Sequence, residues 1–462
     1  MSQKTATEGA VHSDRFPSHF LWGASTSAYQ IEGATRVDGR GESIWDRFAA
    51  TPGKVYQGDT GDVALEHYYR FQEDIALMKK LHFNAYCFSI AWPRIIPEGT
   101  GTVNEKGLDF YDRLVDELLA QGITPLVKLY HWDLPYALQE RGGWLRRETA
   151  QAFADYAEIV ARRLRDRVNW WITFNEPWCI AYLGHGVGVH APGLANKQDA
   201  LNAGHHVLLA HGLVLPRLRA LLQPGAKIGF TVDPYPVYAM DESDEARQQA
   251  ERLDRFRNRW FLDPLFRGCY PDGLFEDLGC VAPDIQPDDM ARIAAPLDFL
   301  GVNYYSRWRT SRESNALEAL PVPEDAPRTV MGWEIYPQGL LEALRQVQQD
   351  YAPPAIVITE NGAAFNDIWD GGDLVHDPER VEYMRSHLAS IEAAVAEGIP
   401  VQGHFAWSLM DNYEWAEGYS KRFGLVYVDY PSQKRIIKQS GLWYANYIEA
   451  QQKSAAVTEQ TD

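Results

Sequence analysis

The sequence predicts an α/β protein, a single (β/α)8 TIM barrel with extended βα loops. Eight short apolar runs alternate with longer amphipathic segments along the 462 residues. The runs are rich in β-branched and aromatic residues and lack polar alternation, as expected of strands buried on both faces. This alternation is typical of a closed parallel barrel. An open doubly wound sheet is the alternative, but no G-x-G-x-x-G motif follows an early strand.

The first half of the chain contains four expected strands. Each is a short run with β-branched or aromatic residues, and segments with helical periodicity separate them. The clearest helix is amphipathic and ends before Gly122, a typical helix stop. The expected strands are 20–25, 84–90, 124–130 and 169–174, and the expected helices are 63–81, 108–119 and 149–168.

The second half repeats the pattern. Three prolines in 311–329 indicate an inserted loop. The expected strands are 227–232, 298–303, 356–359 and 401–407, and the expected helices are 201–222, 242–266, 339–351, 378–398 and 441–452. We expect residues 16–450 to form the barrel domain, with 1–15 as a disordered lead-in and 451–462 as a disordered tail.

The charge of the chain limits its partners. Acidic residues outnumber basic ones by 63 to 44, a net charge of −19, whereas nucleic acids and anionic membranes attract basic surfaces. The first 20 residues lack the apolar core of a signal peptide, and no run resembles a membrane span. We therefore expect a cytoplasmic protein that binds neither nucleic acid nor membrane.

No cofactor or metal is expected. The four cysteines form no C-x-x-C motif, and the histidines between residues 185 and 211 show no H-E-x-x-H spacing. Packing in loops and core explains these histidines better than metal binding. The sequence leaves the oligomeric state open, including a homo-oligomer.

Two of the apolar runs end in a glutamate beside an asparagine. Glu360 follows Ile356–Thr359 and precedes Asn361-Gly362, a turn signal, and Asn175-Glu176 follows 169–174. A lone glutamate there would more often reach solvent in the loop. Because barrel strands bring their carboxyl ends to one face, the two side chains are expected to meet. Such a pair suits glycoside hydrolysis, in which one carboxyl is protonated and the other ionised.

Other strand ends carry aromatic and hydrogen-bonding side chains. Aromatic rings bind the apolar C–H faces of sugars, and polar side chains bind their hydroxyls. Each residue alone is compatible with ordinary packing, but the set predicts a sugar-binding pocket. The candidates are Gln30, His131, Trp132, Asn175, Asn303, Tyr305, Trp407, Glu414 and Trp415.

Five motifs resemble the family 1 glycoside hydrolases, the β-glucosidase family. The resemblance runs from Phe16 to about Tyr447. It implies a (β/α)8 barrel and retaining hydrolysis of β-linked glucosides, often with galactosides and fucosides as further substrates. The motifs are Tyr-His-Trp-Asp-Leu-Pro (130–135), Thr-Phe-Asn-Glu-Pro (173–177), Gly-Val-Asn-Tyr-Tyr (301–305), Ile-Thr-Glu-Asn-Gly (358–362) and His-Phe-Ala-Trp-Ser-Leu-Met-Asp-Asn-Tyr-Glu-Trp (404–415).

The resemblance also implies roles for individual residues. Glu176 matches the acid/base and Glu360 the nucleophile, and retaining geometry would place their carboxyls about 5–5.5 Å apart. Tyr305 could hydrogen-bond Glu360. The non-reducing sugar would be held by Gln30, His131, Asn175, Trp407, Glu414 and Trp415, with Phe423 beside them; Trp178, Leu183, His185 and Trp333 match positions around the leaving group.

One position departs from the family. An arginine usually precedes the Phe-Ser of the second strand, close to the nucleophile, whereas this chain has Cys87 before Phe88-Ser89. Loss of a guanidinium would raise the pKa of Glu360. Either the nucleophile has lost its cation, in which case Cys87→Arg should raise turnover or move the acid limb of the pH profile down, or another cation or a water replaces it.

Other functions fit less well. A phospho-β-glycosidase would need cations after the eighth strand, where Glu414 would repel a phosphate. A myrosinase-type enzyme would carry glutamine at the position of Glu176. A sugar-binding protein that has lost catalysis and a transglycosidase remain the alternatives to a hydrolase acting on a small β-glycoside.

Overall fold

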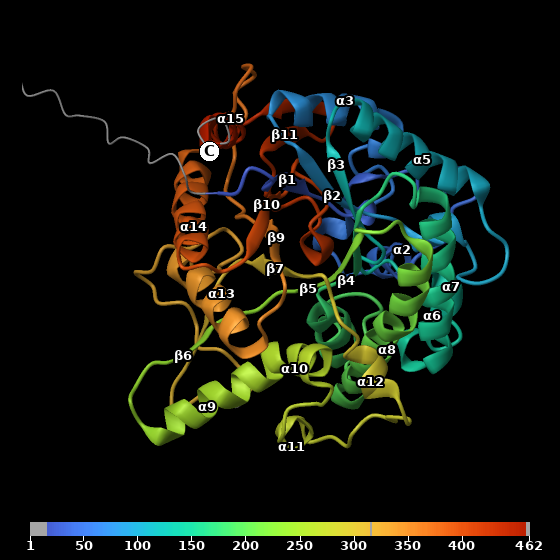
Figure 1. Cartoon of the computed structure of the whole chain (residues 1–462), viewed down its shortest axis with the longest axis vertical. Coiled ribbons are helices and arrows are strands. Elements are labelled where there is room, and N and C mark those ends of the chain that lie inside the picture. Colours follow the sequence, from blue (N-terminus) through green and yellow to red (C-terminus); the bar gives the residue numbers. More distant parts are fainter. Residues whose placement is uncertain (1–15, 315–316, 459–462) are drawn as a thin grey trace, which may run out of the picture.

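Eight parallel strands close into a barrel at the centre of the molecule (Figure 1). The computed structural model describes residues 16–314 and 317–458. The barrel order is β1-β10-β9-β7-β5-β4-β3-β2, which confirms the predicted fold and excludes the open sheet. The strands are β1 (Leu21–Ser25), β2 (Ala85–Ser89), β3 (Thr124–Lys128), β4 (Trp170–Asn175), β5 (Lys227–Val232), β7 (Phe299–Tyr304), β9 (Ile356–Asn361) and β10 (Val401–Trp407).

The long helices surround the barrel (Figure 1), and their apolar residues belong to the buried core. In α5, for example, Leu108, Tyr111, Leu114 and Leu118 are buried at the spacing of one helix face. The principal helices are α3 (His67–Lys80), α5 (Glu105–Ala120), α7 (Arg147–Leu164), α8 (Lys197–Leu221), α9 (Asp244–Asp254), α10 (Trp260–Arg267), α13 (Pro337–Tyr351), α14 (Pro378–Ala396) and α15 (Gln439–Thr458).

Shorter elements occupy the connections. Ser43 and Asp46 form a capping box at the start of α2. The short helices are α1 (Ala28–Ile31), α2 (Ile44–Ala49), α4 (Trp92–Ile95), α6 (Tyr136–Gln139), α11 (Leu274–Leu278) and α12 (Asp289–Ile293). Two small sheets lie outside the barrel: β6 (Val237–Ala239) with β8 (Trp308–Thr310), and β11 (Val426–Asp429) with β12 (Lys434–Ile437).

The interior of the barrel is a separate apolar core. Leu126 and Ile172 pack there with Cys87, Val357 and Phe405, all fully buried. Inward-pointing residues alternate with residues that face the helices, because successive strand side chains point to opposite faces. A residue two positions after an interior residue in the same strand therefore also points into the barrel, nearer the carboxyl ends of the strands.

Several boundaries differ from the predictions. The expected single helix over 242–266 is α9 and α10 joined by a π-helical turn at Arg255–Arg259. Strand β9 continues through Glu360 and Asn361, since both pair with β7. Helix α15 continues through Thr458, beyond the expected end of the domain at 450. Of the segments expected to be disordered, 1–15 and 451–462, residues 451–458 belong to α15 instead, and residues 1–15 and 459–462 lie outside the described residues.

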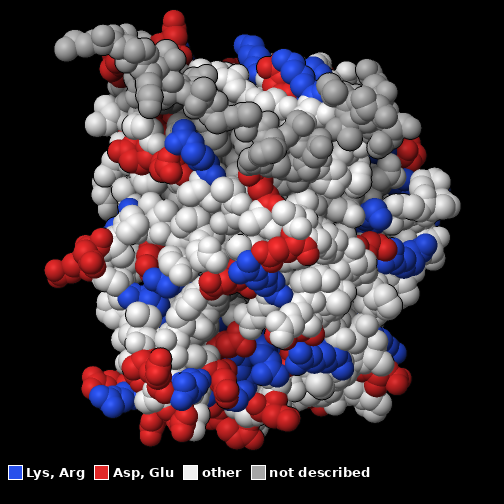
Figure 2. Space-filling model, turned by 60° about the vertical axis from the view of Figure 1, so that its left-hand side comes forward, with Lys and Arg blue, Asp and Glu red and all other residues white. Residues whose placement is uncertain are grey.

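Basic and acidic side chains are interspersed on the face shown in Figure 2, despite the net charge of −19. Many of the Lys and Arg side chains are paired, as in the contacts of Arg252 and Arg255 with Asp277 of α11. In the described part of the chain, the structure contains no helix that is both long and apolar enough to cross a membrane.

Candidate active site

A pocket of about 530 Å³ opens at the carboxyl ends of the barrel strands. Both glutamates singled out in the sequence line it: Glu176 directly follows β4, and Glu360 is the penultimate residue of β9. The size is typical of a small-molecule site. Among the other predicted residues, the pocket is lined by His131, Trp132, Trp178, Tyr305, Trp333, Trp407, Glu414, Trp415 and Phe423.

Two predicted residues lie directly behind the lining. The Nδ2 atom of Asn303 donates to Glu176 Oε1 at 2.6 Å, and also contacts Asn175 Oδ1 at 3.3 Å. The Nδ2 atom of Asn175 lies 3.3 Å from His131 Nε2. Burial and Lys128 keep the pKa of His131 well below its usual value, so the imidazole is neutral and can accept at Nε2. These contacts hold the Glu176 carboxyl and the His131 imidazole in fixed positions.

Gln30 also lies behind the pocket, on the short helix α1. Its Nε2 atom donates to the Tyr413 carbonyl at 2.8 Å and contacts Glu414 Oε2 at 3.4 Å. Burial and the charges of Glu360 and Glu417 raise the pKa of Glu414 to about 8. Gln30 therefore fastens the loop after β10 and orients a carboxyl that can accept or donate to a hydroxyl.

The Glu360 carboxyl is held by two donors from other strands. Lys128 Nζ, at the end of β3, lies 2.5 Å from Oε1, and the Tyr305 hydroxyl donates to Oε2 at 2.8 Å. Burial raises the pKa of Glu360 above its usual value, and Lys128 and Tyr305 offset part of this rise. Because an ammonium and a hydroxyl both donate to it, Glu360 is the carboxyl of the pair that carries the charge.

Lys128 was missed in the sequence, although a signal was present. It is the only charged residue in the otherwise apolar run Pro125–Tyr130. A lysine within a strand buried on both faces needs an anionic partner, so its position pointed to a charge inside the barrel. The sequence left open whether Glu360 lacks a cation because Cys87 occupies the usual arginine position. The structure shows that Lys128 supplies a cation beside Glu360.

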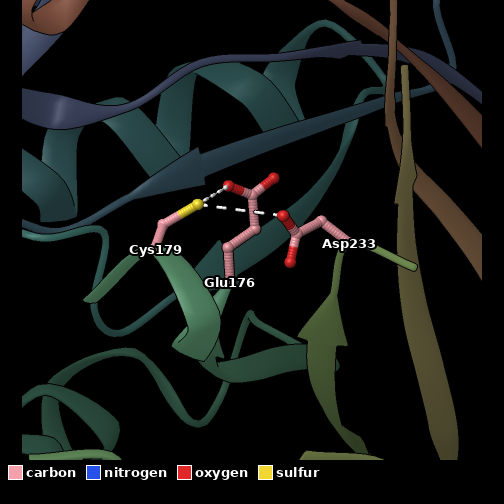
Figure 3. Close-up of side chains that lie close together, drawn as sticks. All are labelled: Glu176, Cys179 and Asp233. Atoms are coloured by element: carbon pink, nitrogen blue, oxygen red, sulfur yellow. Dashed lines mark hydrogen bonds between the residues drawn. The ribbon is translucent and has the colours of Figure 1, made fainter. Parts of the chain in front are cut away.

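Glu176 lies against a thiol and a second carboxyl (Figure 3). Cys179 Sγ lies 3.3 Å from Glu176 Oε2 and 3.8 Å from Asp233 Oδ2. Burial raises the pKa of Glu176 well above its usual value, and the charges of Asp233 and Glu360 raise it further. No ion pair to Glu176 occurs within residues 16–314 and 317–458. Glu176 is therefore the carboxyl that keeps its proton.

Asp233 was also missed. It directly follows β5, and polar residues at the carboxyl ends of the other barrel strands were chosen as candidates for that reason. The same criterion predicts Asp233 as a site residue. Arg257, in the π-helical turn before α10, binds its carboxylate and lies 4.2 Å from the Trp178 ring. One potential metal-ligand atom each from Glu176, Cys179 and Asp233 lies within 4.8 Å of the other two. Because Arg257 already pairs with Asp233, this cluster fits control of the Glu176 proton better than binding of a cation.

Three lining residues have left-handed backbone conformations. The φ angles are +49° at Glu176, +78° at Trp132 and +50° at Trp415. Residues other than glycine adopt this backbone conformation at a cost of about 1–3 kcal/mol each. At Glu176 the turn directly follows β4 and aims the carboxyl into the pocket instead of along the strand.

The mouth of the pocket is aromatic. Trp333 packs 5.3 Å from the Tyr305 ring and 6.1 Å from the Phe423 ring. Leu183 and Trp178, two residues expected near the leaving group, also line the pocket. His185 does not: it is buried, with Nδ1 bound to the Ile180 carbonyl at 2.9 Å, because a second π-helical segment, Cys179–Gly186, directs the ring into the core.

The arrangement pairs a protonated and an ionised carboxyl in one pocket whose walls include six tryptophans. Such a pair can donate a proton to a glycosidic oxygen while the charged partner acts on the anomeric carbon. The rings offer flat apolar surfaces to a sugar, and the amide, imidazole and carboxyl groups offer hydrogen bonds to its hydroxyls.

Comparisons with known proteins agree with this chemistry. The model of glycosyl hydrolase family 1 matches residues 12–453. The chain is 48% identical over 436 residues to β-glucosidase A of Thermotoga maritima, covering 94% of this chain and 98% of that protein. It is 46% identical over 461 residues to a bifunctional β-D-glucosidase/β-D-fucosidase of Bifidobacterium breve, with coverage of 94% and 98%.

A solved structure shows the same likeness. The β-glucosidase from Thermotoga maritima in complex with glucoimidazole superposes with a TM-score of 0.91 at 47% identity, covering 94% of this chain and 99% of that chain. The sequence motifs, the barrel and these matches agree along nearly the whole chain. The chain belongs to glycosyl hydrolase family 1 and is a glycoside hydrolase.

Proposed function

We propose that the protein is a retaining β-glucosidase that releases terminal non-reducing β-D-glucosyl residues. The substrates we propose are cello-oligosaccharides and aryl or alkyl β-glucosides. The observation that carries this proposal is the unequal pair in the pocket: Lys128 and Tyr305 stabilise charge on Glu360, whereas Asp233 and burial keep the proton on Glu176. The names of the Thermotoga maritima relatives support glucose as the sugar.

In the first step, Glu360 attacks the anomeric carbon and forms a glycosyl ester. The bond to the leaving oxygen breaks at the same time, and Glu176 transfers its proton to that oxygen. Glu176 suits this role because burial and the charges of Asp233 and Glu360 raise its pKa and so favour the protonated form. We expect the separation of the carboxyls to be about 5–5.5 Å, as direct attack requires.

In the second step, water attacks the glycosyl ester. Esterification removes the negative charge of Glu360, which is one cause of the raised pKa of Glu176. The pKa of Glu176 therefore falls, and the carboxylate can accept a proton from the water. The ester C–O bond breaks, and the sugar leaves with the same anomeric configuration as the substrate.

We propose that the sugar is held by groups around the two carboxyls. Asn175 would bind the 2-hydroxyl, a contact that strengthens as positive charge develops on the ring. His131, Gln30 and Glu414 would bind the outer hydroxyls. Trp407 and Trp415 would pack against the sugar, with Phe423 beside them and Trp333 and Trp178 around the leaving group.

Side activities on β-galactosides and β-fucosides are part of this proposal. The Bifidobacterium breve relative carries both glucosidase and fucosidase in its name, which supports a tolerant sugar site. A second candidate is transglycosylation, since a sugar hydroxyl could replace water in the second step. The aromatic mouth formed by Trp178, Trp333 and Trp308 favours such an acceptor.

A matched pair of variants tests the proposal. With 2,4-dinitrophenyl β-glucoside and azide, Glu360→Gly should form α-glucosyl azide, because azide occupies the place of the missing nucleophile. Glu176→Ala should form β-glucosyl azide, because azide then attacks the ester from the opposite face. NMR of the products distinguishes the two anomers. The same azide anomer from both variants would contradict the roles.

Assays of the wild-type protein test the substrate range and distinguish hydrolysis from transglycosylation. A panel of aryl β-glycosides and cellobiose ranks glucosides, galactosides and fucosides, and chromatography of the products detects transglycosylation. Binding of cellobiose without cleavage would leave a sugar-binding protein as the function. Initial release of α-glucose would contradict the retaining mechanism.

A further inference from the structure

Lys128 is the charged group in closest contact with the proposed nucleophile. Its side chain is fully buried, and its Nζ lies 2.5 Å from Glu360 Oε1 and 2.9 Å from Ser25 Oγ. In residues 16–314 and 317–458, no other lysine or arginine pairs with Glu360. The ammonium also lies 5.6 Å from the ring centre of Trp407, which lines the same pocket. Lys128 thus connects the nucleophile to the wall that would hold the sugar.

The register of two neighbouring strands explains how Lys128 reaches this place. Leu126 points into the barrel, so Lys128, two residues later, points inward as well and nearer the site face. On the adjacent strand β2, Cys87 pairs with Leu126 and Ser89 pairs with Lys128. Cys87 is buried in the barrel interior, one layer below the ammonium. A small side chain on β2 therefore lies next to a long cationic one on β3.

The charge states of the surrounding groups are consistent. Burial raises the pKa of Cys87 to about 11, so the thiol is neutral near pH 7. Burial opposes the charged form of Lys128, but the neighbouring acidic groups raise its pKa above the usual value, so the ammonium persists. The titratable groups that face the Lys128–Glu360 pair from the surrounding strands and loops are Cys87, His131, Glu176, Asp233, Tyr305 and Glu414.

We propose, on the basis of the hydrolase mechanism above, that Lys128 is the positioning residue that keeps Glu360 ionised and aligned for attack. Cys87 is its structural counterpart, because a neutral small side chain at that position leaves the adjacent barrel layer open to the ammonium. The cation that serves the nucleophile comes from β3 in this protein, and the second strand contributes only space.

The same contact serves both chemical steps. Before attack, Lys128 and Tyr305 each hold one oxygen of Glu360, which fixes the plane of the carboxylate. After attack, Glu360 is a neutral ester, and Glu176 is a remaining carboxyl that interacts with the ammonium. A persistent positive charge there stabilises ionised Glu176, the form needed as base in the second step.

Lys128→Met removes the charge and keeps much of the volume. An opposite charge within about 4–6 Å lowers a carboxyl pKa by about 1–3 units, so the acid limb of kcat/KM should move up by about 1–3 pH units. Lys128→Arg should move it less. Lys227→Met is the matched control: it removes the same charge at the start of β5, the opposite end of the barrel, and should leave the acid limb unchanged.

A double variant tests the relation between the two strands. In Cys87→Arg/Lys128→Ser, the guanidinium comes from β2 and the shorter serine leaves room for it. The acid limb should return to within about one pH unit of the wild type. Cys87→Arg alone places two cations side by side in the barrel, so we expect lower stability and lower activity, in place of the gain that the sequence suggested. A double variant that folds but keeps the raised acid limb would overturn the proposal.

A second measurement isolates the first chemical step. The rate at which a 2-deoxy-2-fluoro-β-glucosyl fluoride esterifies Glu360 depends on the ionisation of that carboxyl and needs no proton from Glu176. In Lys128→Met this rate should show the same shift of the acid limb, while the inhibition constant of glucose changes less than threefold. A large change in glucose binding with an unmoved acid limb would indicate a merely structural role and overturn the proposal.

The outcomes separate this inference from the proposed function. An inactive wild-type protein would contradict the proposed function itself. An active wild-type protein together with an unshifted Lys128→Met profile would contradict only the role of Lys128. If Lys128→Met does not fold, Lys128→Arg and the double variant decide the question by the same pH profiles.

Discussion

The carboxyl of Asp233 offers a quantitative test of how the proton is kept on Glu176. Both side chains are only 5% exposed, and their oxygens lie within 4.8 Å of each other. Two unit charges at this distance interact by about 3.5 kcal/mol at an effective dielectric constant of about 20. Since about 1.4 kcal/mol corresponds to one pKa unit, a charge on Asp233 at this distance raises the pKa of Glu176 by about 2.5 units.

Asp233→Asn removes this charge with little change in shape. In the wild-type protein, the positive charge of Arg257 offsets part of the effect of Asp233 on Glu176. In the variant, Arg257 has no carboxylate partner at position 233, and its charge favours ionised Glu176. Both effects lower the pKa of Glu176. The protonated acid is then lost at lower pH, so the basic limb of kcat/KM should move down by about 1–3 pH units.

The assay is the pH profile of kcat/KM with a β-glucoside whose leaving group needs protonation, such as cellobiose. Asp277→Asn is the control, because Asp277 also pairs with arginines but lies on α11, outside the residues that line the pocket. It should leave the basic limb unchanged. A basic limb that stays in place or moves up in Asp233→Asn would refute the reasoning that Glu176 is the acid and that the charge of Asp233 raises its pKa.

Two further predictions concern the leaving group and the stability of the barrel. Trp333→Ala should raise KM for aryl β-glucosides about tenfold, the equivalent of about 1.4 kcal/mol. Methyl β-glucoside, whose leaving group is too small to reach the ring, should change less; an equal change for both substrates would contradict a leaving-group role. Lys438→Met should lower the free energy of unfolding by about 3–5 kcal/mol in urea titrations, because Nζ lies 2.6 Å from both Asp367 Oδ2 and Asp411 Oδ1 in the interior. The control Lys453→Met, at an exposed pair, should leave the unfolding midpoint unchanged, and a similar loss in both variants would argue against a special role for the buried pair.

Much of the architecture could be predicted because it depends on local patterns. Each barrel strand is a continuous apolar run, since helices cover its outer face and other strands its inner face. The end of each run could therefore be located to within a few residues, and with it the positions of Glu176 and Glu360. Boundaries were less certain where pairing extends a strand past a turn signal, as at Asn361, which pairs with β7.

Most of the candidate site could be predicted for the same reason. A closed parallel barrel brings the carboxyl ends of all its strands to one face. The sequence therefore predicts that residues such as His131 and Trp407, far apart in the chain, lie near each other. The prediction was wrong for His185, because the direction of a side chain in a π-helical turn does not follow from the sequence pattern.

The sequence by itself determined that eight buried strands carry two glutamates and many aromatic residues to a common face. Only the tertiary structure decided which groups control those glutamates: Lys128 from β3 at Glu360, and Asp233 with Arg257 at Glu176. The physical reason is that the pKa of a buried carboxyl depends on charges a few ångströms away in space. Those charges come from other strands and turns, and their distances are set by strand register and side-chain direction, which no local pattern encodes.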